Sequence, residues 1–393
     1  FSIKIGEIDC SLRVHNFKTQ VSATLGRLCI FVLHKNSDMK VNPAYNTKES
    51  LLELYNKPLL ELVFEAATIH RQFHNPREVQ MSSLLSIKTG GCPEDCGYCP
   101  QAARYHTDVE AHKLMTVESV IEQAKNAQAN GSSRLCMGAA WREVRDNKDF
   151  DNVIEMVQAV NDLDMEVCCT LGMLTEEQAQ RLADAGLYAY NHNIDTSEEH
   201  YSEVITTRTF DDRLNTHKNV RKAGVTLCSG GIIGLGEQKE DRMKMLITLA
   251  NMEVQPESVP INTLVPVKGT PMQDYEKVPV WDLVRLVAIA RIMMPKSAVR
   301  LSAGRLDLTD EGQALCFMAG ANSIFAGDKL LTTPNPEFGR DEELFKILRI
   351  QPKAPYQDGE KRIPNEKYKE STAKKEMEEK VKQWKEEIKN TTV

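Results

Sequence analysis

Three cysteines stand close together in one short segment of the chain. Cys92, Cys96 and Cys99 have the spacing C-x3-C-x2-C, in a stretch that also holds glycine and proline. Thiolate sulfur is the soft ligand that zinc and iron–sulfur clusters prefer, and such a loop can wrap around a metal group without helical constraint. A closed structural zinc site takes four ligands in recognisable pairs, and this loop offers three. The spacing therefore favours an iron–sulfur cluster with one open iron over zinc.

A second group of side chains is scattered in the sequence, but each member falls in a different strand-like segment. The group consists of Cys136, Cys168, Cys228 and Arg300. In the segment MEVCCTLG, apolar residues alternate with the others, which puts Cys168 on the opposite face from Cys169. The same alternation turns the rest of the group inward. If these strands close into one barrel, the four side chains meet inside it.

Ordinary explanations of this second group stay open from the residues alone. Any single buried cysteine is commonly a small core residue. A guanidinium inside a barrel needs a partner, and Glu166, on the same face as Cys168, could pair with Arg300 in a purely structural account. Arginine is also a very poor metal ligand, because it stays protonated in essentially every protein setting.

The elements that would position these side chains follow residue 80. Short apolar segments, each followed by a helical or loop segment, lie at 84–90, 133–140, 165–172, 187–194, 225–234, 258–265, 298–304 and 323–328. Such alternation predicts parallel strands with right-handed crossovers, and eight repeats suit a closed TIM-type (β/α)8 barrel over residues 81–350. Thr175 with Gln178 predicts a helix-capping box, and Gly186 and Gly224 stand where helices should end.

The segment before the barrel predicts a helical cap over residues 39–80. Apolar residues recur at helical spacing from Glu49 to Phe73, and Pro58 interrupts the pattern. Because proline breaks a helix interior, we expect two short helices joined at a kink.

The segment after the barrel, residues 351–393, turns to proline and then to lysine and glutamate, which predicts a charged tail. Met377, Val381, Trp384 and Ile388 form a narrow apolar stripe on an otherwise charged helix. Such a stripe favours a solvated helix that docks loosely on its own barrel over a partner-binding helix.

Residues 1–38 lack a clear period and precede Met39. Three interpretations stay open: an upstream artefact with Met39 as the true start, an organelle presequence, or an authentic extension. Glu7 and Asp9 weaken the presequence interpretation, because such peptides avoid acidic residues. We expect a cytoplasmic protein, or a mitochondrial one if the leader is a genuine presequence.

Composition excludes several function classes. Charged residues make up 27% of the 393 residues and the formal net charge is -7, so we expect a mildly acidic globular protein that does not bind nucleic acid. The apolar run Leu28–Leu33 is far shorter than the roughly 20 residues that cross a bilayer, so we expect no membrane span. The 10 cysteines are unevenly spaced, which favours metal or redox chemistry over a disulfide framework.

The cysteine loop after the first expected strand resembles the signature of the radical S-adenosylmethionine enzymes. The resemblance implies a [4Fe-4S] cluster on Cys92, Cys96 and Cys99, whose open iron binds S-adenosylmethionine and cleaves it to a 5′-deoxyadenosyl radical. Tyr98 is similar to the aromatic residue that this family places beside the adenine. The alternative for Tyr98 is an exposed aromatic residue in a turn.

The second group resembles, position by position, the residues that hold a second cluster in the biotin synthase family. The resemblance implies a [2Fe-2S] cluster on Cys136, Cys168, Cys228 and Arg300, which supplies sulfur for the conversion of dethiobiotin to biotin. It spans approximately residues 51–352. The other cysteines have no counterpart and are expected to be structural: Cys10, Cys29, Cys169 and Cys316.

Polar residues on the fourth expected strand are candidates for the substrate pocket. Asn191, Asn193 and Asp195 share one face that leads to the carboxyl end of the barrel, where active sites of such barrels lie. An amide can donate to and accept from a ureido ring. By resemblance, Asn191, Asn193 and Asn262 contact dethiobiotin, and Asn193 and Asp195 contact the cofactor, Asp195 at the ribose hydroxyls. His192 has the opposite parity and is expected to be a packed or solvent-linked histidine.

Gly230, Ile232, Gly234 and Glu237 resemble the family's adenosine-contacting segment G-x-I-x-G-x-x-E. This pattern is weak on its own. Glycines at a strand end commonly mean a bend or a close backbone approach, and Glu237 could simply cap the next helix.

The resemblance also implies partners: an external electron donor, iron–sulfur assembly factors and a second copy in a homodimer. Two rival functions stay open. One is another radical enzyme of cofactor biosynthesis without sulfur insertion, against which the second group argues. The other is a non-enzymatic iron–sulfur scaffold, which would leave Asn191 to Asp195 and Asn262 without a task.

Overall fold

The computed structural model describes residues 48–365 and 381–382. The strands that form the barrel wall are β1 (Glu78–Lys88), β2 (Arg134–Ala139), β3 (Glu166–Thr170), β4 (Ala189–Asn191), β5 (Thr226–Cys228), β6 (Gly231–Ile233), β7 (Ser258–Thr263), β8 (Ala298–Leu301) and β9 (Ser323–Ala326). Neighbours pair in parallel in the order β1-β2-β3-β4-β5-β7-β8-β9, and β9 pairs back with β1. The sheet is therefore closed, as the alternation of segments predicts.

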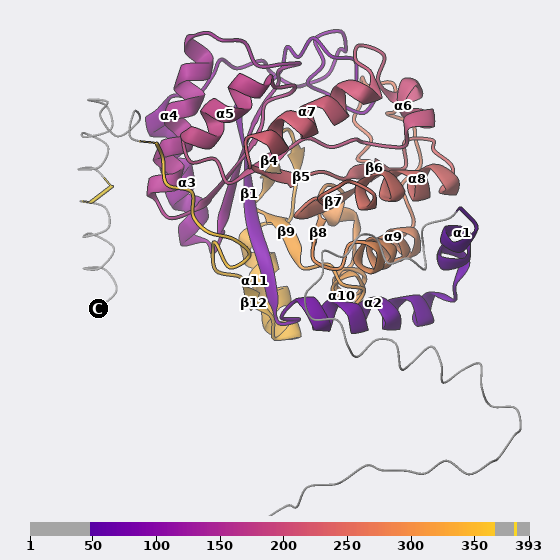
Figure 1. The fold of residues 1–393 in the computed structure, drawn as a ribbon. Helices are drawn as coiled ribbons and strands as arrows, with labels where there is room; N and C mark the ends of the chain where they lie inside the picture. Colours follow the sequence, from indigo (N-terminus) through magenta and orange to yellow (C-terminus); the bar gives the residue numbers. More distant parts are fainter. Residues whose placement is uncertain (1–47, 366–380, 383–393) are drawn as a thin grey trace, which may run out of the picture. The chain divides into compact units, whose positions relative to one another are not determined.

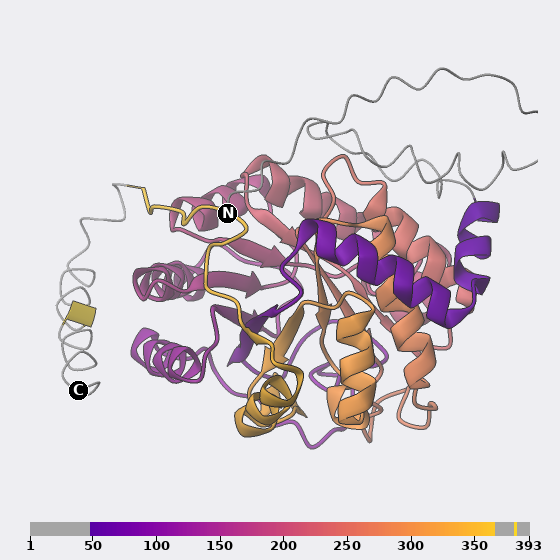
Figure 2. The same ribbon diagram turned by 90° about the horizontal axis from the view of Figure 1, so that it is seen from below.

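Helices surround the strands on the outside (Figures 1 and 2). They are α1 (Lys48–Asn56), α2 (Leu59–Phe73), α3 (Val117–Ala129), α4 (Lys148–Asp162), α5 (Glu176–Asp184), α6 (Glu198–Val204), α7 (Phe210–Lys222), α8 (Lys239–Ala250), α9 (Val280–Met293), α10 (Asp310–Met318) and α11 (Phe338–Leu348). The predicted capping box of Thr175 and Gln178 begins α5. Gly186 and Gly224 follow α5 and α7 with φ of 98° and 67°, the left-handed conformation that favours glycine after a helix.

The fifth expected strand is split in two. β5 ends at Cys228, and β6 begins at Gly231 and pairs with β7. At Gly230, between them, a Cβ atom would lie 1.9 Å from the carbonyl oxygen of Pro260, so only glycine fits this close approach.

The two N-terminal helices meet at Pro58, as the interrupted pattern predicts. Helix α2 lies along α9 (Figure 1). Arg285 of α9 donates to the carbonyl oxygens of Tyr55 and Lys57 at 2.6 and 2.8 Å. These bonds fix the junction between α1 and α2 to the barrel.

The segment after α11 continues along the amino-terminal end of the barrel. Its strand β12 (Gln351–Pro352) pairs with the start of β1. Tyr356 then donates from its backbone N–H to Glu166 at 2.7 Å and from its hydroxyl to the carbonyl oxygen of Met165 at 2.5 Å. Residues up to 365 therefore lie against the barrel rather than apart from it.

Some expectations fall outside the described residues. The leader 1–38, and Met377, Trp384 and Ile388 of the apolar stripe, are among them; Val381 is described, helical and buried. Within residues 48–365 and 381–382, no helix has the length and apolar character needed to cross a membrane.

Alternation along the strands sorts the cysteines as predicted. Cys169 packs in the apolar layer between the strands and the helices, with Val167 and Leu171. Cys136 and Cys168 instead pack inside the barrel, with Phe325. The two faces of β3 therefore carry different chemistry.

Candidate active site

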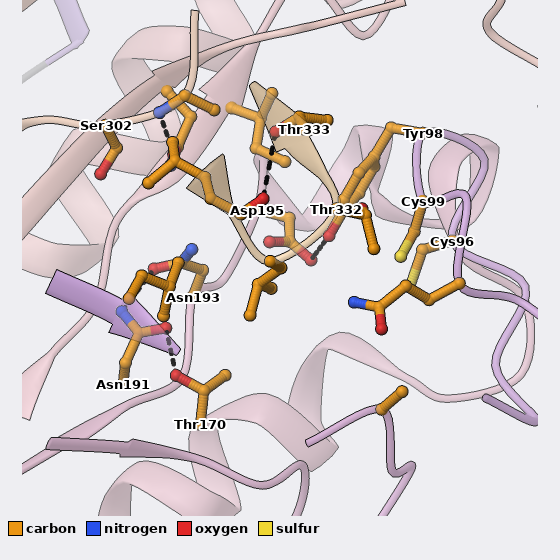
Figure 3. A pocket seen from close by; sticks show the side chains of 18 of the residues that line it. Cys96, Tyr98, Cys99, Thr170, Asn191, Asn193, Asp195, Ser302, Thr332 and Thr333 are labelled. Carbon is orange, nitrogen blue, oxygen red and sulfur yellow. Dashed lines mark hydrogen bonds between the residues drawn. The ribbon is translucent and has the colours of Figure 1, made fainter. Parts of the chain in front are cut away.

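A cavity of about 310 Å³ lies at the carboxyl end of the barrel and continues into its interior. Both cysteine groups contribute to its lining, through Cys92, Cys96 and Cys99 of the loop after β1 and through Cys136 of β2. Figure 3 shows Cys96 and Cys99 on one side of this cavity and Asn191 on the opposite side.

The cysteine loop is a compact, internally bonded turn. The backbone N–H of Cys92 donates to Gln101 and that of Cys99 to Cys96, both at 2.9 Å. Burial raises the pKa of the Cys96 thiol to about 11 and that of Cys99 to about 12. At neutral pH these thiols therefore stay protonated, although Arg208 and Arg213 partly offset the effect of burial on Cys96, whereas a metal group would bind them as thiolates.

Among the described residues, no three His, Cys, Asp or Glu side chains converge on a single-ion site. A four-iron cluster separates its thiolates by more than one ion does, since iron and sulfide atoms stand between them. The lack of a single-ion site therefore does not count against a four-iron cluster on these three thiols. All three thiols are free, so they are available to bind a metal group.

Two acidic residues inside the loop tie it to the segment after α6. Asp95 accepts from the backbone N–H groups of Thr206 and Thr207 at 2.9 and 3.1 Å. Burial alone would raise the pKa of Asp95, but hydrogen bonds from the hydroxyls and the backbone N–H groups of Thr206 and Thr207 outweigh it and lower the pKa to about 2. Glu94, also buried, lies 3.8 Å from Arg208. The loop is thus anchored by charges that its cysteine spacing does not reveal.

Arg208 lies against the loop thiols. Its Nη2 donates to Cys96 Sγ at 3.8 Å, and its buried Nε has no hydrogen-bond partner within the described part of the chain. A guanidinium at this place adds positive charge where thiolate character would develop.

Tyr98, Asp195 and Arg213 form one buried network at the cavity. The Tyr98 hydroxyl donates to Asp195 Oδ2 at 3.1 Å (Figure 3), and Arg213 of α7 forms an ion pair with the same oxygen. Tyr98 is half-buried and lines the cavity, so it is no exposed turn residue. Burial, with the charge of Asp195, raises its pKa well above the usual range. Asp195 has a positive φ of 67°, which turns its carboxylate at the strand end.

The three asparagines line the cavity as expected. Asn191 donates to Cys228 Sγ at 3.1 Å and accepts from Thr170 at 3.3 Å (Figure 3). Asn193 accepts from the backbone N–H of Gly230 at 3.2 Å. Asn262 donates to the Gly231 carbonyl oxygen at 2.9 Å. Their amides are therefore oriented by the protein itself.

The second group of side chains meets inside the barrel below this cavity. The register pairs Cys136 with Cys168 on β2 and β3, and Arg300 Nη1 lies 3.7 Å from Cys228 Sγ. A hydrogen bond between the Cys136 and Cys168 thiols lowers the pKa of Cys136, aided by the Arg300 and Arg134 guanidiniums, and with burial it raises the pKa of Cys168. All four residues are fully buried.

Glu166 is not the partner of Arg300. The alternative that these two residues form a purely structural ion pair is therefore wrong. Glu166 instead pairs with Arg134, whose Nη2 lies 2.6 Å away. Arg300 donates to neutral groups: Ser323 Oγ at 2.9 Å, Gln80 Oε1 at 3.2 Å and Ser82 Oγ at 3.3 Å. Gln80 lies between the two, because its Nε2 donates to Glu166 Oε2 at 3.1 Å while its Oε1 accepts from Arg300.

The segment after β5 lines the cavity through Ile232. Gly230, Gly234 and Glu237 are not among the lining residues and shape the turn instead. The Glu237 carboxylate accepts from the backbone N–H groups of Gly234 and Leu235 at 3.0 and 2.6 Å and pairs with Arg242. Glu237 does not cap α8, because Gln238 is its N-cap residue.

His192 is buried, as its parity predicts. Burial, with the nearby Arg213 and Arg208, lowers its pKa well below the usual range. Its backbone carbonyl oxygen accepts from His217 at 2.6 Å.

Comparison with known proteins agrees with this geometry. Residues 86–250 match the model of the Radical SAM superfamily, and residues 260–351 match the Biotin and Thiamin Synthesis associated domain. A biotin synthase of Christiangramia forsetii is 66% identical over 311 residues, which cover 79% of this chain and 86% of that protein. The chain belongs to the biotin synthase family.

Other members of the biotin synthase family match a similar share of the chain. The enzyme of Nostoc sp. is 58% identical over 79% of this chain and 94% of its own length, and that of Shigella boydii is 58% identical over 78% and 88%. Among solved structures, methylornithine synthase superposes with a TM-score of 0.67 at 20% identity, covering 78% of this chain and 94% of its own. This last likeness concerns the fold alone.

Three site residues carry no signal in the sequence. Arg208 and Arg213 lie on a loop and a helix, where no strand alternation points to the barrel interior. Gln80 lies in β1, which begins at Glu78, before the first expected strand. These three residues can be recognised as part of the site only when the positions of their backbone segments in the fold are known.

Proposed function

We propose that this chain converts dethiobiotin to biotin by radical sulfur insertion, as expected of a biotin synthase family member that uses S-adenosylmethionine and iron–sulfur clusters. The observation that carries the proposal is that one cavity reaches two separate groups of free thiols. The loop thiols lie near its entrance, and the group around Cys136 lies in the barrel interior.

The first group would hold a [4Fe-4S] cluster on Cys92, Cys96 and Cys99. These thiols are free and lie on one short loop beside the cavity. Arg213 is well placed to attract the carboxylate of S-adenosylmethionine, and Asp195 its hydroxyls, with Tyr98 holding Asp195 in place. Ile232 offers an apolar surface to the adenine.

The second group would hold a [2Fe-2S] cluster on Cys136, Cys168, Cys228 and Arg300. The donor set suits it, because three thiols and a guanidinium nitrogen face one another inside the barrel. Ser258, the register partner of Cys228, adds a buried hydroxyl that has no partner within the described part of the chain and could donate to cluster sulfur. When bound, the two clusters with S-adenosylmethionine supply a carbon radical and a sulfur atom.

The asparagines would hold the substrate between these two groups. Asn191, Asn193 and Asn262 present amide donors and acceptors that match a ureido ring. The buried walls exclude water and other hydrogen donors from the reacting carbon atoms. Asn191 also donates to Cys228, which joins the substrate site to the sulfur source.

The proposal includes partners. Reductive cleavage of S-adenosylmethionine requires an external electron donor, and a sulfur source that is consumed requires assembly factors to rebuild it. The family resemblance further suggests a homodimer. The location proposed is cytoplasmic, or mitochondrial if residues 1–38 are a genuine presequence.

Exchange of one cysteine tests the sulfur-source role. Cys168→Ala should abolish biotin formation and spare the cleavage of S-adenosylmethionine, because only the second group is affected. Cys169→Ala is the matched control, since Cys169 is the next residue but faces the helices, and should keep biotin formation. Biotin synthesis retained in Cys168→Ala refutes the role and favours a radical enzyme without sulfur insertion.

A further inference from the structure

Hydrogen bonds from its nitrogens hold the guanidinium of Arg300 in a single orientation. Nε donates to Ser323 Oγ at 2.9 Å, and Nη2 donates to Gln80 Oε1 at 3.2 Å and to Ser82 Oγ at 3.3 Å. Nη1 alone faces a thiol, Cys228 Sγ, at 3.7 Å. Arg300 is fully buried and makes no ion pair within residues 48–365. The contacts of two nitrogens therefore decide which nitrogen meets the second cysteine group.

The Gln80 amide can bind Arg300 in only one of its two orientations. A glutamine amide has an oxygen end and a nitrogen end of nearly the same shape, and only the oxygen can accept from a guanidinium. Gln80 Nε2 donates to Glu166 Oε2 at 3.1 Å. A carboxylate only accepts hydrogen bonds, so the nitrogen end faces Glu166 and the oxygen end faces Arg300. Reversal of the amide would lose both bonds.

Glu166 is itself held rigidly. Arg134 Nε donates to the same carboxylate oxygen at 2.7 Å, and the backbone N–H of Tyr356 donates to the other at 2.7 Å. Gln80 is 4% exposed and Glu166 2%, so bulk water does not compete for these bonds. Ser323 completes the set, since its hydroxyl accepts from Arg300 and donates to Gln80 Oε1 at 3.2 Å.

We propose that Gln80 is the positioning residue that directs Arg300 Nη1 toward the second cysteine group, with the direction of its amide set by Glu166. The inference rests on the proposed two-iron site. It assigns Gln80 no contact with substrate. An amide at this place orients the guanidinium through a neutral oxygen, whereas a carboxylate would form an ion pair with it.

The test is the spectrum of the second cluster in the full chain after anaerobic reconstitution with iron and sulfide. Gln80→Met keeps the length of the side chain and removes both amide bonds. We expect its two-iron absorption, circular dichroism and reduced-state paramagnetic resonance signals to shift in the direction that Arg300→Met shifts them, with the iron and sulfide content of the second site unchanged. A wild-type spectrum in Gln80→Met, when Arg300→Met differs from the wild type, overturns the inference.

A matched control separates positioning from loss of stability. Gln313 also accepts, through Oε1, from a buried guanidinium, that of Arg305 at 2.8 Å, but within residues 48–365 neither side chain forms a hydrogen bond with a residue of the second cysteine group. Gln313→Met should therefore lower the melting temperature and leave the cluster spectrum unchanged. A spectral shift in Gln313→Met equal to that in Gln80→Met contradicts positioning.

A second variant keeps the inference testable if Gln80→Met does not fold. Glu166→Gln retains the shape of Glu166 and frees the Gln80 amide to reverse, so it should shift the same spectrum although Glu166 does not contact Arg300. No shift in Glu166→Gln contradicts the role of Glu166. Failure of the proposed function looks different, because the wild-type chain itself would then lack a two-iron signal.

Discussion

At the scale of single residues, the site depends on buried charges that are paired within the protein. Asp195 and Arg213 are the clearest case, because both side chains are almost fully buried and Tyr98 also donates to Asp195. A pair of this kind holds its geometry before any ligand arrives. Such preorganisation lowers the cost of ordering the site on binding.

Asp195→Asn should raise the KM for S-adenosylmethionine about 10- to 150-fold, since hydrogen bonds to charged groups contribute about 1.5–3 kcal/mol. The KM for dethiobiotin should change little. Steady-state kinetics at saturating concentrations of the other substrate measure both.

The control is Asp341→Asn, which removes a carboxylate from the equally buried Arg305–Asp341 pair. It should reduce stability and leave the KM for S-adenosylmethionine unchanged. If both variants raise this KM equally, Asp195 acts through the fold and not through the cofactor.

At the scale of elements, the cap helix α2 buries groups that acid would charge. Burial, with the positive charge of Arg291, lowers the pKa of His70 to about 3 and that of His74 to about 4. Arg291 makes its hydrogen bonds to carbonyl oxygens and to His74, at 2.8 Å. Protonated His70 would therefore lie beside a buried cation, and the folded chain keeps it neutral.

The sign of the pH effect follows from proton binding. Unfolded His70 binds a proton below its ordinary pKa of 6.5, while folded His70 does so only near 3. Between these values the unfolded chain holds more protons, so stability is complete above pH 6.5 and falls with decreasing pH. From pH 6.5 to 4.5 we expect a loss of roughly 2–3 kcal/mol from His70.

His70→Leu should remove this part of the acid sensitivity. Urea unfolding of the variant and the wild type at several pH values measures it, and His112→Leu, at an exposed position, is the control. Equal pH dependence in all three chains would contradict the assignment to His70.

Alternation along strands predicted the inward and outward residues, because one face of each strand packs on helices and the other faces the barrel interior. On β3 this separates Cys168 from Cys169. A bend or a close backbone approach at Gly230 was among the sequence-based interpretations, but the partner was not predictable, since Pro260 approaches from a strand about thirty residues away. Arg213 was missed for a similar reason, as α7 has to be packed on the barrel before its arginine reaches Asp195.

At the scale of the molecule, the segment 351–365 closes the amino-terminal end of the barrel beneath the second cysteine group. Its Tyr356 bonds to Glu166 and stacks edge-on against Tyr188, with ring centroids 5.5 Å apart. Farther along, the backbone N–H of Asn365 donates to Asp184 at 2.8 Å. Most of the segment is exposed, so its release costs little buried apolar area.

A chain that ends at Pro352 should therefore lose iron from the second site to a chelator about tenfold faster, if loss of these contacts lowers the cost of opening by about 1.4 kcal/mol. Release from the four-iron site should not change. A chain that ends at Asn365 retains the described segment and is the control. Equal release from both shortened chains would mean that residues 353–365 do not protect the second site.

The central claim is that the second cysteine group supplies the sulfur. Mössbauer spectroscopy with iron and sulfide counting on the anaerobically reconstituted chain, before and after turnover with dethiobiotin and S-adenosylmethionine, measures it directly. We predict a two-iron signal beside the four-iron signal, and its decay in step with the appearance of biotin. A chain that holds only a four-iron cluster, or a two-iron signal that persists while biotin accumulates, would contradict the claim.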